Sequence, residues 1–122
     1  MKTMSHAARA AVPVIAIHGG AGTLMRSHIS PAQESAYHAA LQDVLRASQA
    51  VLAGGGTALD AVCVAVQALE DCPLFNAGHG AVFTADATHE LDAAVMDGAT
   101  LAAGAVAGVA RVRNPVLAAR EV

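Results

Sequence analysis

Apolar positions recur with the period of a helix in the first half of the chain. Ser30 and Gln33 have the spacing of a capping box, and Pro31 suits a first helical turn. The glycines at 54–56 stop the pattern. One face of the predicted helix carries Tyr37, Leu41, Val44, Leu45, Val51 and Leu52. The pattern therefore predicts one long helix between Ser30 and these glycines.

A second helix is predicted for the stretch TALDAVCVAVQALED, residues 57–71, with Thr57 as its cap. Alanines and valines occupy most of its surface, which leaves a narrow polar stripe of Asp60, Gln67 and Asp71. Its main apolar face carries Leu59, Val62, Cys63, Val66 and Leu69. Such a helix is nearly buried all round, so we expect other elements to cover both of its sides.

Short apolar runs that end at glycines or turn residues predict strands. The run VPVIAI, residues 12–17, is typical of a buried strand. Residues 80–86 and 88–98 predict two strands joined by a tight turn near Asp86 and Ala87. The sequence thus predicts a sheet whose strands come from both ends of the chain.

The C-terminal part predicts one more strand and one more helix. Residues 100–112 are predicted to form a strand of small side chains, which would let another layer approach closely. Asn114 and Pro115 occupy the cap and first-turn positions of the last helix. Strand, two helices, several strands and a helix predict an α+β fold, with helices covering at least one face of the sheet.

The amino-acid composition indicates which side chains fill the core and which classes of partner are excluded. The 122 residues include no Trp, one Tyr and two Phe, so Ala and Val must fill one domain or part of one. The net charge of −3 argues against nucleic acid or an anionic membrane as a partner. Without a signal peptide or a membrane-length apolar run, we expect a cytoplasmic protein. Cys63 and Cys72 are expected to be buried thiols, and residues 1–12 a tail.

The stretch IHGGAG, residues 17–22, is the first candidate for chemistry. Gly19 and Gly20 have no Cβ, so their backbone N–H groups can approach a ligand and hold a carboxylate or an oxyanion. The plainer interpretation is a tight turn at the end of a strand. His18 is either a hydrogen-bonded structural residue or a base. The glycine spacing does not fit the dinucleotide fingerprint.

The stretch DCPLFNAGHGAVFT, residues 71–84, is the second candidate. Pro73 restrains its start, and Gly78 and Gly80 permit left-handed backbone angles. A compact turn of this kind points carbonyl oxygens inward, where a hard cation binds, and Asn76 adds an amide donor. An ordinary ordered loop is the alternative.

Other polar residues do not suggest a metal or acid/base site. The histidines at 6, 18, 28, 38, 79 and 89 show no i, i+4 pair and no convergent carboxylate, so a zinc site is not expected. Asp92 and Asp97 are an odd number of residues apart on one predicted strand. They therefore lie on opposite faces and cannot act side by side.

Together these stretches resemble one family. AIHGGAGT (16–23), the run from GGTALD to AVAGV (55–109) and VRNPVLAAR (112–120) are similar to the plant-type L-asparaginases, also called isoaspartyl peptidases. The resemblance extends over about residues 14–122. It implies an N-terminal-nucleophile (Ntn) hydrolase with a four-layer αββα fold, made as a precursor that cleaves itself into two subunits. The new N-terminal threonine of the second subunit then attacks asparagine or β-aspartyl dipeptides.

The resemblance also implies roles for residues of this chain. Gly19, Gly20 and Asn76 would line the active site beside the threonine. A structural sodium ion, with no other cofactor, would be bound by main-chain carbonyls of Leu69, Glu70, Cys72, Phe75, Ala77 and His79. The family further implies a dimer of αβ units.

Two departures from the family pattern matter. Ala87 stands where the family usually has glycine, a small cost if φ is positive there. The nucleophile, a Gly-Thr pair followed by a strand like VGAVALD, is not found, and Gly22-Thr23 and Gly56-Thr57 do not replace it. We therefore expect residues 13–122 to be the N-terminal portion of the first subunit, inactive alone. A glycosylasparaginase or threonine aspartase relative, or a non-catalytic module, are the alternatives.

Overall fold

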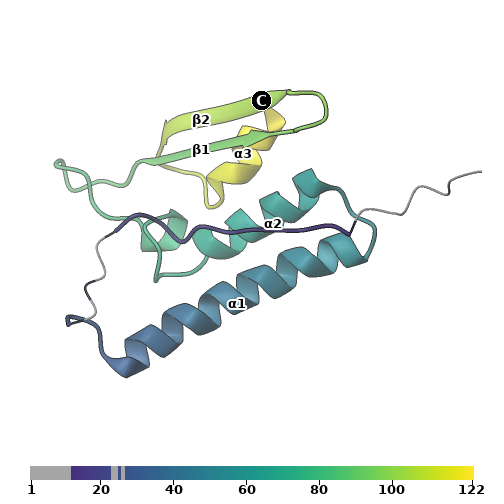
Figure 1. Ribbon diagram of the computed structural model, residues 1–122. Helices are drawn as coiled ribbons and strands as arrows, with labels where there is room; N and C mark the ends of the chain where they lie inside the picture. The colour runs from purple at the N-terminus through teal and green to yellow at the C-terminus, as the bar shows by residue number, and fades with distance from the viewer. Residues whose placement is uncertain (1–11, 23–24, 26) are drawn as a thin grey trace, which may run out of the picture.

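Two helices packed side by side and a hairpin backed by a third helix form the described part of the chain (Figure 1). The computed structural model describes residues 12–22, 25 and 27–122. The elements follow the order α1 (Pro31–Ala53), α2 (Ala58–Glu70), the 3-10 turn η1 (Gly78–Gly80), β1 (Leu91–Met96), β2 (Ala103–Val109) and α3 (Pro115–Glu121). This arrangement confirms the α+β class within the described residues. None of their helices is both long and apolar enough to cross a membrane.

Both long helices begin at the predicted residues. The Ser30 Oγ accepts the Gln33 N–H at 3.2 Å, and the Gln33 side chain accepts the Ser30 N–H at 2.8 Å. Thr57 and Asp60 make the same reciprocal pair at the start of α2, at 3.0 and 3.2 Å. Each capping box therefore satisfies two N–H groups that a helix start leaves without partners.

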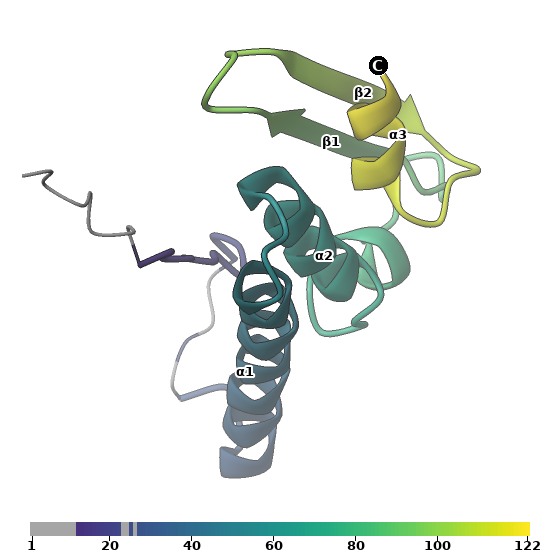
Figure 2. The same cartoon turned by 90° about the vertical axis from the view of Figure 1, so that its right-hand side faces the viewer.

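One glycine in the connection between α1 and α2 packs closely against the end of α1. A Cβ on Gly56 would lie 2.5 Å from Cγ1 of Val51 in the last turns of α1. Only a residue without a side chain fits there, so the chain turns directly from one helix into the other. Figure 2 shows the result, with α2 lying between α1 and the hairpin backed by α3.

The hairpin pairs β1 with β2 in antiparallel register and contains one bulge. Leu91 pairs with Val109 and Ala93 with Val106, so β2 has one extra residue between these positions. Gly108 takes a φ of 63° inside the bulge. Its N–H donates to Oδ1 of Asp92 at 2.8 Å. The Asp92 side chain thus replaces a ladder bond that the bulge removes.

The helix α3 packs on one face of this hairpin at close range. A Cβ on Gly104 would collide with the main-chain oxygen of Ala119. This confirms the prediction that the small residues of 100–112 let another layer approach. The buried apolar residues are also mostly small: Val44, Ala61, Cys63, Ala65, Phe75, Val116 and Ala119.

Two expectations about burial were too strong. Cys63 is buried, but Cys72 is only half-buried, and both are free thiols. Val62, on the predicted apolar face of α2, is 39% exposed. The helix is therefore not buried all round within the described residues.

Two predicted strands are wrong in this structure. Residues 12–17 run as an extended segment past α1 and α2 with no strand partner in the described chain, and Val14 is 89% exposed (Figure 1). Residues 80–86 form a loop, because their backbone groups bond locally: the Thr84 N–H donates to the Thr88 carbonyl at 2.8 Å. The predicted turn is present beside them, with Ala87 at a φ of 57°.

Candidate active site

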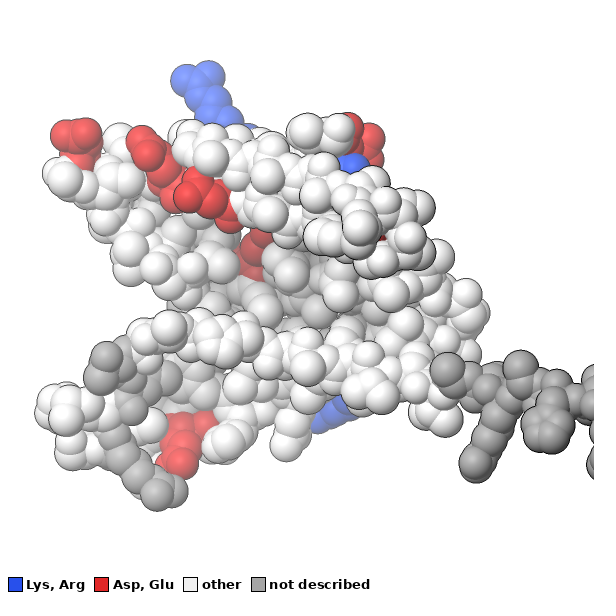
Figure 3. Space-filling view, turned by 45° about the horizontal axis from the view of Figure 1, so that its top comes forward, with Lys and Arg blue, Asp and Glu red and all other residues white. Residues whose placement is uncertain are grey.

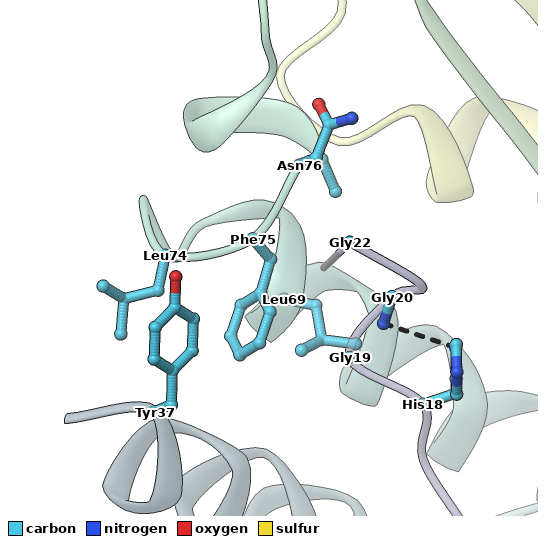
Figure 4. A pocket seen from close by; sticks show the side chains of 10 residues that line it. His18, Gly19, Gly20, Gly22, Tyr37, Leu69, Leu74, Phe75 and Asn76 are labelled. Carbon is cyan, nitrogen blue, oxygen red and sulfur yellow. Dashed lines mark hydrogen bonds between the residues drawn. The ribbon is translucent and has the colours of Figure 1, made fainter. Parts of the chain in front are cut away.

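A hollow of about 430 Å³ brings the two candidate stretches together. The glycine turn of residues 18–20 forms one wall, and Tyr37 of α1 forms another. Phe75 and Asn76, from the loop after α2, complete it. Figure 4 shows these residues, with the rings of Tyr37 and Phe75 beside each other and the Asn76 amide pointing away from both. Residues separated by more than fifty positions therefore meet at one place.

The glycine turn is held by its own histidine. Gly20 has a φ of 109°, and its N–H donates to Nδ1 of His18 at 3.3 Å (Figure 4). His18 is thus a hydrogen-bonded structural residue here, and its Nδ1 is an acceptor. The same bond uses the Gly20 N–H, one of the two groups predicted to hold an oxyanion. In this conformation that N–H points at the histidine ring.

The second glycine of the turn touches the loop after α2. A Cβ on Gly19 would lie 3.1 Å from Cε1 of Phe75 and 3.4 Å from Cδ2 of Leu41. Phe75 is only 6% exposed, and its ring meets the Tyr37 ring edge-on at 5.9 Å between centroids. Phe75 therefore fixes the loop against both α1 and the glycine turn.

The stretch 71–84 forms a compact turn and contains no β-strand. Gly78 has a φ of 48°, as predicted, whereas Gly80 does not take a positive φ. Gly80 is needed for space, since a Cβ there would collide with the Phe75 carbonyl oxygen and lie 2.7 Å from that of Pro73. A Cβ on Gly78 would likewise collide with the carbonyl oxygen of Glu70. Main-chain oxygens therefore gather against these two glycines.

The carbonyls predicted to bind sodium belong to the last two residues of α2 and to this turn. Four of the six accept one loop hydrogen bond each, from the N–H groups of Cys72, Phe75, Ala77 and Gly80 at 3.2, 3.4, 2.8 and 3.0 Å. A carbonyl oxygen has two lone pairs, so the three of these carbonyls that lie in the turn can each accept a further partner, whereas that of Leu69 also accepts the Asp71 N–H. Among the described residues, no three His, Cys, Asp or Glu side chains converge as metal ligands. Main-chain oxygens are therefore the donor set that this loop offers to a hard cation.

Asn76 lies on the border of two hollows. Its Oδ1 accepts the Val82 N–H at 3.0 Å, which leaves the amide nitrogen as the group able to contact a ligand. The second hollow, of about 420 Å³, is lined by Asn76 together with Glu70, Glu90 and Asp92. Figure 3 shows a notch in the molecule with acidic side chains on and above its wall. The three carboxylates that line the second hollow would attract a cation more than an anion.

A side-chain cluster at the end of α2 was not predicted from the sequence. Glu70 is 3% exposed, and its Oε1 accepts the Val116 N–H at 3.0 Å. Its Oε2 accepts the Asn114 amide at 3.1 Å. Burial raises the pKa of Glu70, although these two donors act in the opposite direction. A glutamate among the apolar residues of α2 was the only signal in the sequence.

The neighbouring aspartate is exposed and differs in charge environment. Asp71 Oδ1 accepts Nε of Arg113 at 3.0 Å and the Asn114 amide at 3.2 Å. The Arg113 hydrogen bond, followed by that of Asn114, lowers the pKa of Asp71. Asn114 precedes α3 as predicted, but its side chain does not cap that helix. Glu70 accepts the helix N–H instead.

The fold and the hollow define an α+β protein in which a glycine turn meets a carbonyl-rich loop, and sequence comparison identifies its family. A family model described as asparaginase matches residues 11–122. The chain belongs to this asparaginase family, which confirms the resemblance seen in the motifs.

Individual relatives carry two kinds of name. The isoaspartyl peptidase of Escherichia coli (strain K12) is 63% identical over 107 residues, and the plant-type L-asparaginase of Thermococcus kodakarensis is 48% identical over 113 residues. The isoaspartyl peptidase/L-asparaginase of Danio rerio is 43% identical over 109 residues. These alignments cover 88%, 88% and 89% of this chain, but 33%, 34% and 34% of the relatives. The chain thus spans about a third of the length of the relatives it matches.

Proposed function

We propose that this chain is part of an amidohydrolase that cleaves the side-chain amide of L-asparagine or the isopeptide bond of β-aspartyl dipeptides. The observation that carries the proposal is the hollow in which Gly19, Gly20 and Asn76 meet. The names of its relatives supply the substrate class. The nucleophile would be a threonine on polypeptide outside these 122 residues.

In this reaction the threonine hydroxyl attacks the amide carbon and its proton passes to the free α-amine beside it. The carbonyl oxygen becomes an oxyanion, which N–H donors stabilise until the bond to nitrogen breaks. Ammonia, or the second amino acid through its amino group, leaves with the proton that the α-amine returns, and water then hydrolyses the ester. The free amide nitrogen of Asn76 and the backbone of Gly19 and Gly20 are the groups of this chain that would contact the substrate or the nucleophile.

We further propose that the loop after α2 binds a structural sodium ion, and we name residues 69–79 the cation loop. Its ligands would be the main-chain oxygens of Leu69, Glu70, Cys72, Phe75, Ala77 and His79. The crowding of oxygens from Glu70 and Phe75 against Gly78 and Gly80 supports this assignment. When bound, the ion would fix the loop that presents Asn76.

The four-layer αββα sandwich is the architecture that would complete this site. In it, residues 12–17 would pair as a strand with sheet segments outside these residues, which would satisfy backbone groups that have no strand partner here. A dimer of αβ units in the cytoplasm is the corresponding assembly.

The test is reconstitution. This chain is mixed with a polypeptide that supplies the threonine half of a plant-type asparaginase, and ammonia release from L-asparagine is measured alongside cleavage of a β-aspartyl dipeptide. We expect no activity from either part alone and activity from the complex. Asn76→Ala in this chain should lower kcat, and Thr→Ala in the other part should abolish it. A complex that forms without activity would overturn the proposal and favour a non-catalytic module.

A further inference from the structure

We infer that Asn114 is a positioning residue for the cation loop, an inference that rests on the sodium site of the proposed function. Its side-chain amide nitrogen donates to the carboxylates of two consecutive residues, to Glu70 Oε2 at 3.1 Å and to Asp71 Oδ1 at 3.2 Å. These two residues are the end of α2 and the start of the loop. Asn114 therefore orients the chain at the point where it leaves the helix.

Two further bonds make this connection stiff. The Val116 N–H donates to Glu70 Oε1 at 3.0 Å, in a buried position. Arg113 Nε donates to Asp71 Oδ1 at 3.0 Å. The start of α3 thus holds both carboxylates at once. An amide between them is favourable because it donates to two anions without adding a charge.

The far end of the cation loop packs on the same two residues. A Cβ on Gly78 would lie 2.8 Å from Cβ of Glu70, so the returning chain touches this residue directly. Nδ1 of His79 lies 3.4 Å from the main-chain oxygen of Asp71. The returning end of the cation loop therefore contacts both Glu70 and Asp71. A change in their orientation moves the oxygens that would surround the ion.

A second connection between α2 and α3 provides a matched control. Arg120 of α3 donates to Oδ1 of Asp60 at 2.5 Å, at the opposite end of α2. It ties the same two helices together but touches no residue of the cation loop. Loss of either connection weakens the docking of α3, whereas only loss of the Asn114 connection should disturb the loop.

The experiment measures sodium affinity by ²³Na relaxation on the 122-residue chain, in NaCl and choline chloride mixtures of constant ionic strength. Wild type, Asn114→Leu and Arg120→Met are compared, with circular dichroism to verify folding. We expect about tenfold weaker sodium binding for Asn114→Leu, because two anionic acceptors lose a donor, and a change of less than about twofold for Arg120→Met. If Asn114→Leu does not fold, Asn114→Ser, whose hydroxyl is too short to join both carboxylates, takes its place.

Hydrogen exchange gives a readout that needs no sodium. The N–H groups of Ala77 and Gly80 donate to carbonyls of the cation loop, at 2.8 and 3.0 Å, and should exchange faster in Asn114→Leu but not in Arg120→Met. Equal effects of the two variants on sodium affinity and exchange would overturn the inference and leave the proposed function intact. Absence of sodium binding by the wild type would instead overturn the sodium assignment, and exchange would then decide the role of Asn114 alone.

Discussion

The two ends of α2 use a carboxylate to bind α3 in opposite ways. At the N-terminal end, Asp60 is 39% exposed in its side chain and pairs with the cationic Arg120. Its hydrogen bond to Thr57, followed by that to Arg120, lowers its pKa to about 2. At the C-terminal end, Glu70 is buried, accepts from neutral donors only, and has a raised pKa.

The difference shows which connection the fold depends on. An exposed ion pair contributes little, since water and salt compete for both partners. Burying a carboxylate costs free energy, but removing the carboxylate leaves its hydrogen-bond donors buried without an acceptor. The C-terminal end should therefore be the sensitive one, although the N-terminal end carries the stronger formal attraction.

The largest expected effect is that of Glu70→Ala. The Val116 N–H and the Asn114 amide would lose their acceptors at a buried position, which should lower the free energy of unfolding by about 3 kcal/mol. Urea unfolding followed by circular dichroism measures this. Glu70→Gln keeps an oxygen for Val116 and should lose clearly less. Equal losses for the two variants would mean that the charge, not the hydrogen bond to α3, is what matters.

The next effect compares a glycine near each end of α2. Gly78 combines a φ of 48° with contact to Glu70, whereas Gly55 has a φ of 82° and open space around it. Alanine at Gly55 should cost about 1 kcal/mol from backbone strain alone, and alanine at Gly78 about 2 kcal/mol or more, because the loop must also shift. The same unfolding measurement applies. A smaller loss at Gly78 than at Gly55 would contradict the close packing of the cation loop on α2.

Arg120→Met should shift the urea midpoint less than either change at the C-terminal end. The methionine keeps most of the apolar stem, and the ion pair that disappears is exposed to solvent. Repeating the measurement in high salt provides the control, because screening should narrow the gap between wild type and variant. A midpoint loss comparable to that of Glu70→Ala would reverse the ranking of the two ends.

The smallest expected effect is on the pH dependence of stability, where Asp60 and Glu70 should contribute slopes of opposite sign. Asp60 has a lowered folded pKa, so its contribution is present above its ordinary value of 3.8 and is lost as pH falls toward about 2. Glu70 has a raised folded pKa, so the folded state binds more protons and stability falls as pH rises above 4.5. Asp60→Asn should flatten the first slope and Glu70→Gln the second, measured as urea midpoints between pH 2 and about 7.

Local signals were sufficient for the helices and for the choice of candidate stretches. Capping residues Ser30 and Thr57 act on backbone groups only three positions away, so their effect can be read without tertiary contacts. The glycine pattern of 71–84 likewise predicted a turn, and Gly78 has the expected left-handed angle. The position of Gly80 was also informative, but the reason is close packing and not its backbone angle.

Strands and the α2–α3 connection could not be predicted in the same way. The runs 12–17 and 80–86 have strand composition, yet a strand exists only where a neighbour accepts its backbone bonds, and none does so in the described chain. Asn114 looked like a helix cap because of its position before Pro115. Its amide instead joins residues more than forty positions earlier.

The amino-acid sequence by itself determined the family, the helix starts and which two stretches carry candidate chemistry, because these depend on short-range patterns of residues. Only the tertiary structure decided that the glycine turn and Asn76 share one hollow, and that Glu70 receives its partners from α3. The physical reason is distance along the chain. A buried acceptor accepts a hydrogen bond from whichever donor the packing brings to it, and no local sequence pattern predicts which donor that is.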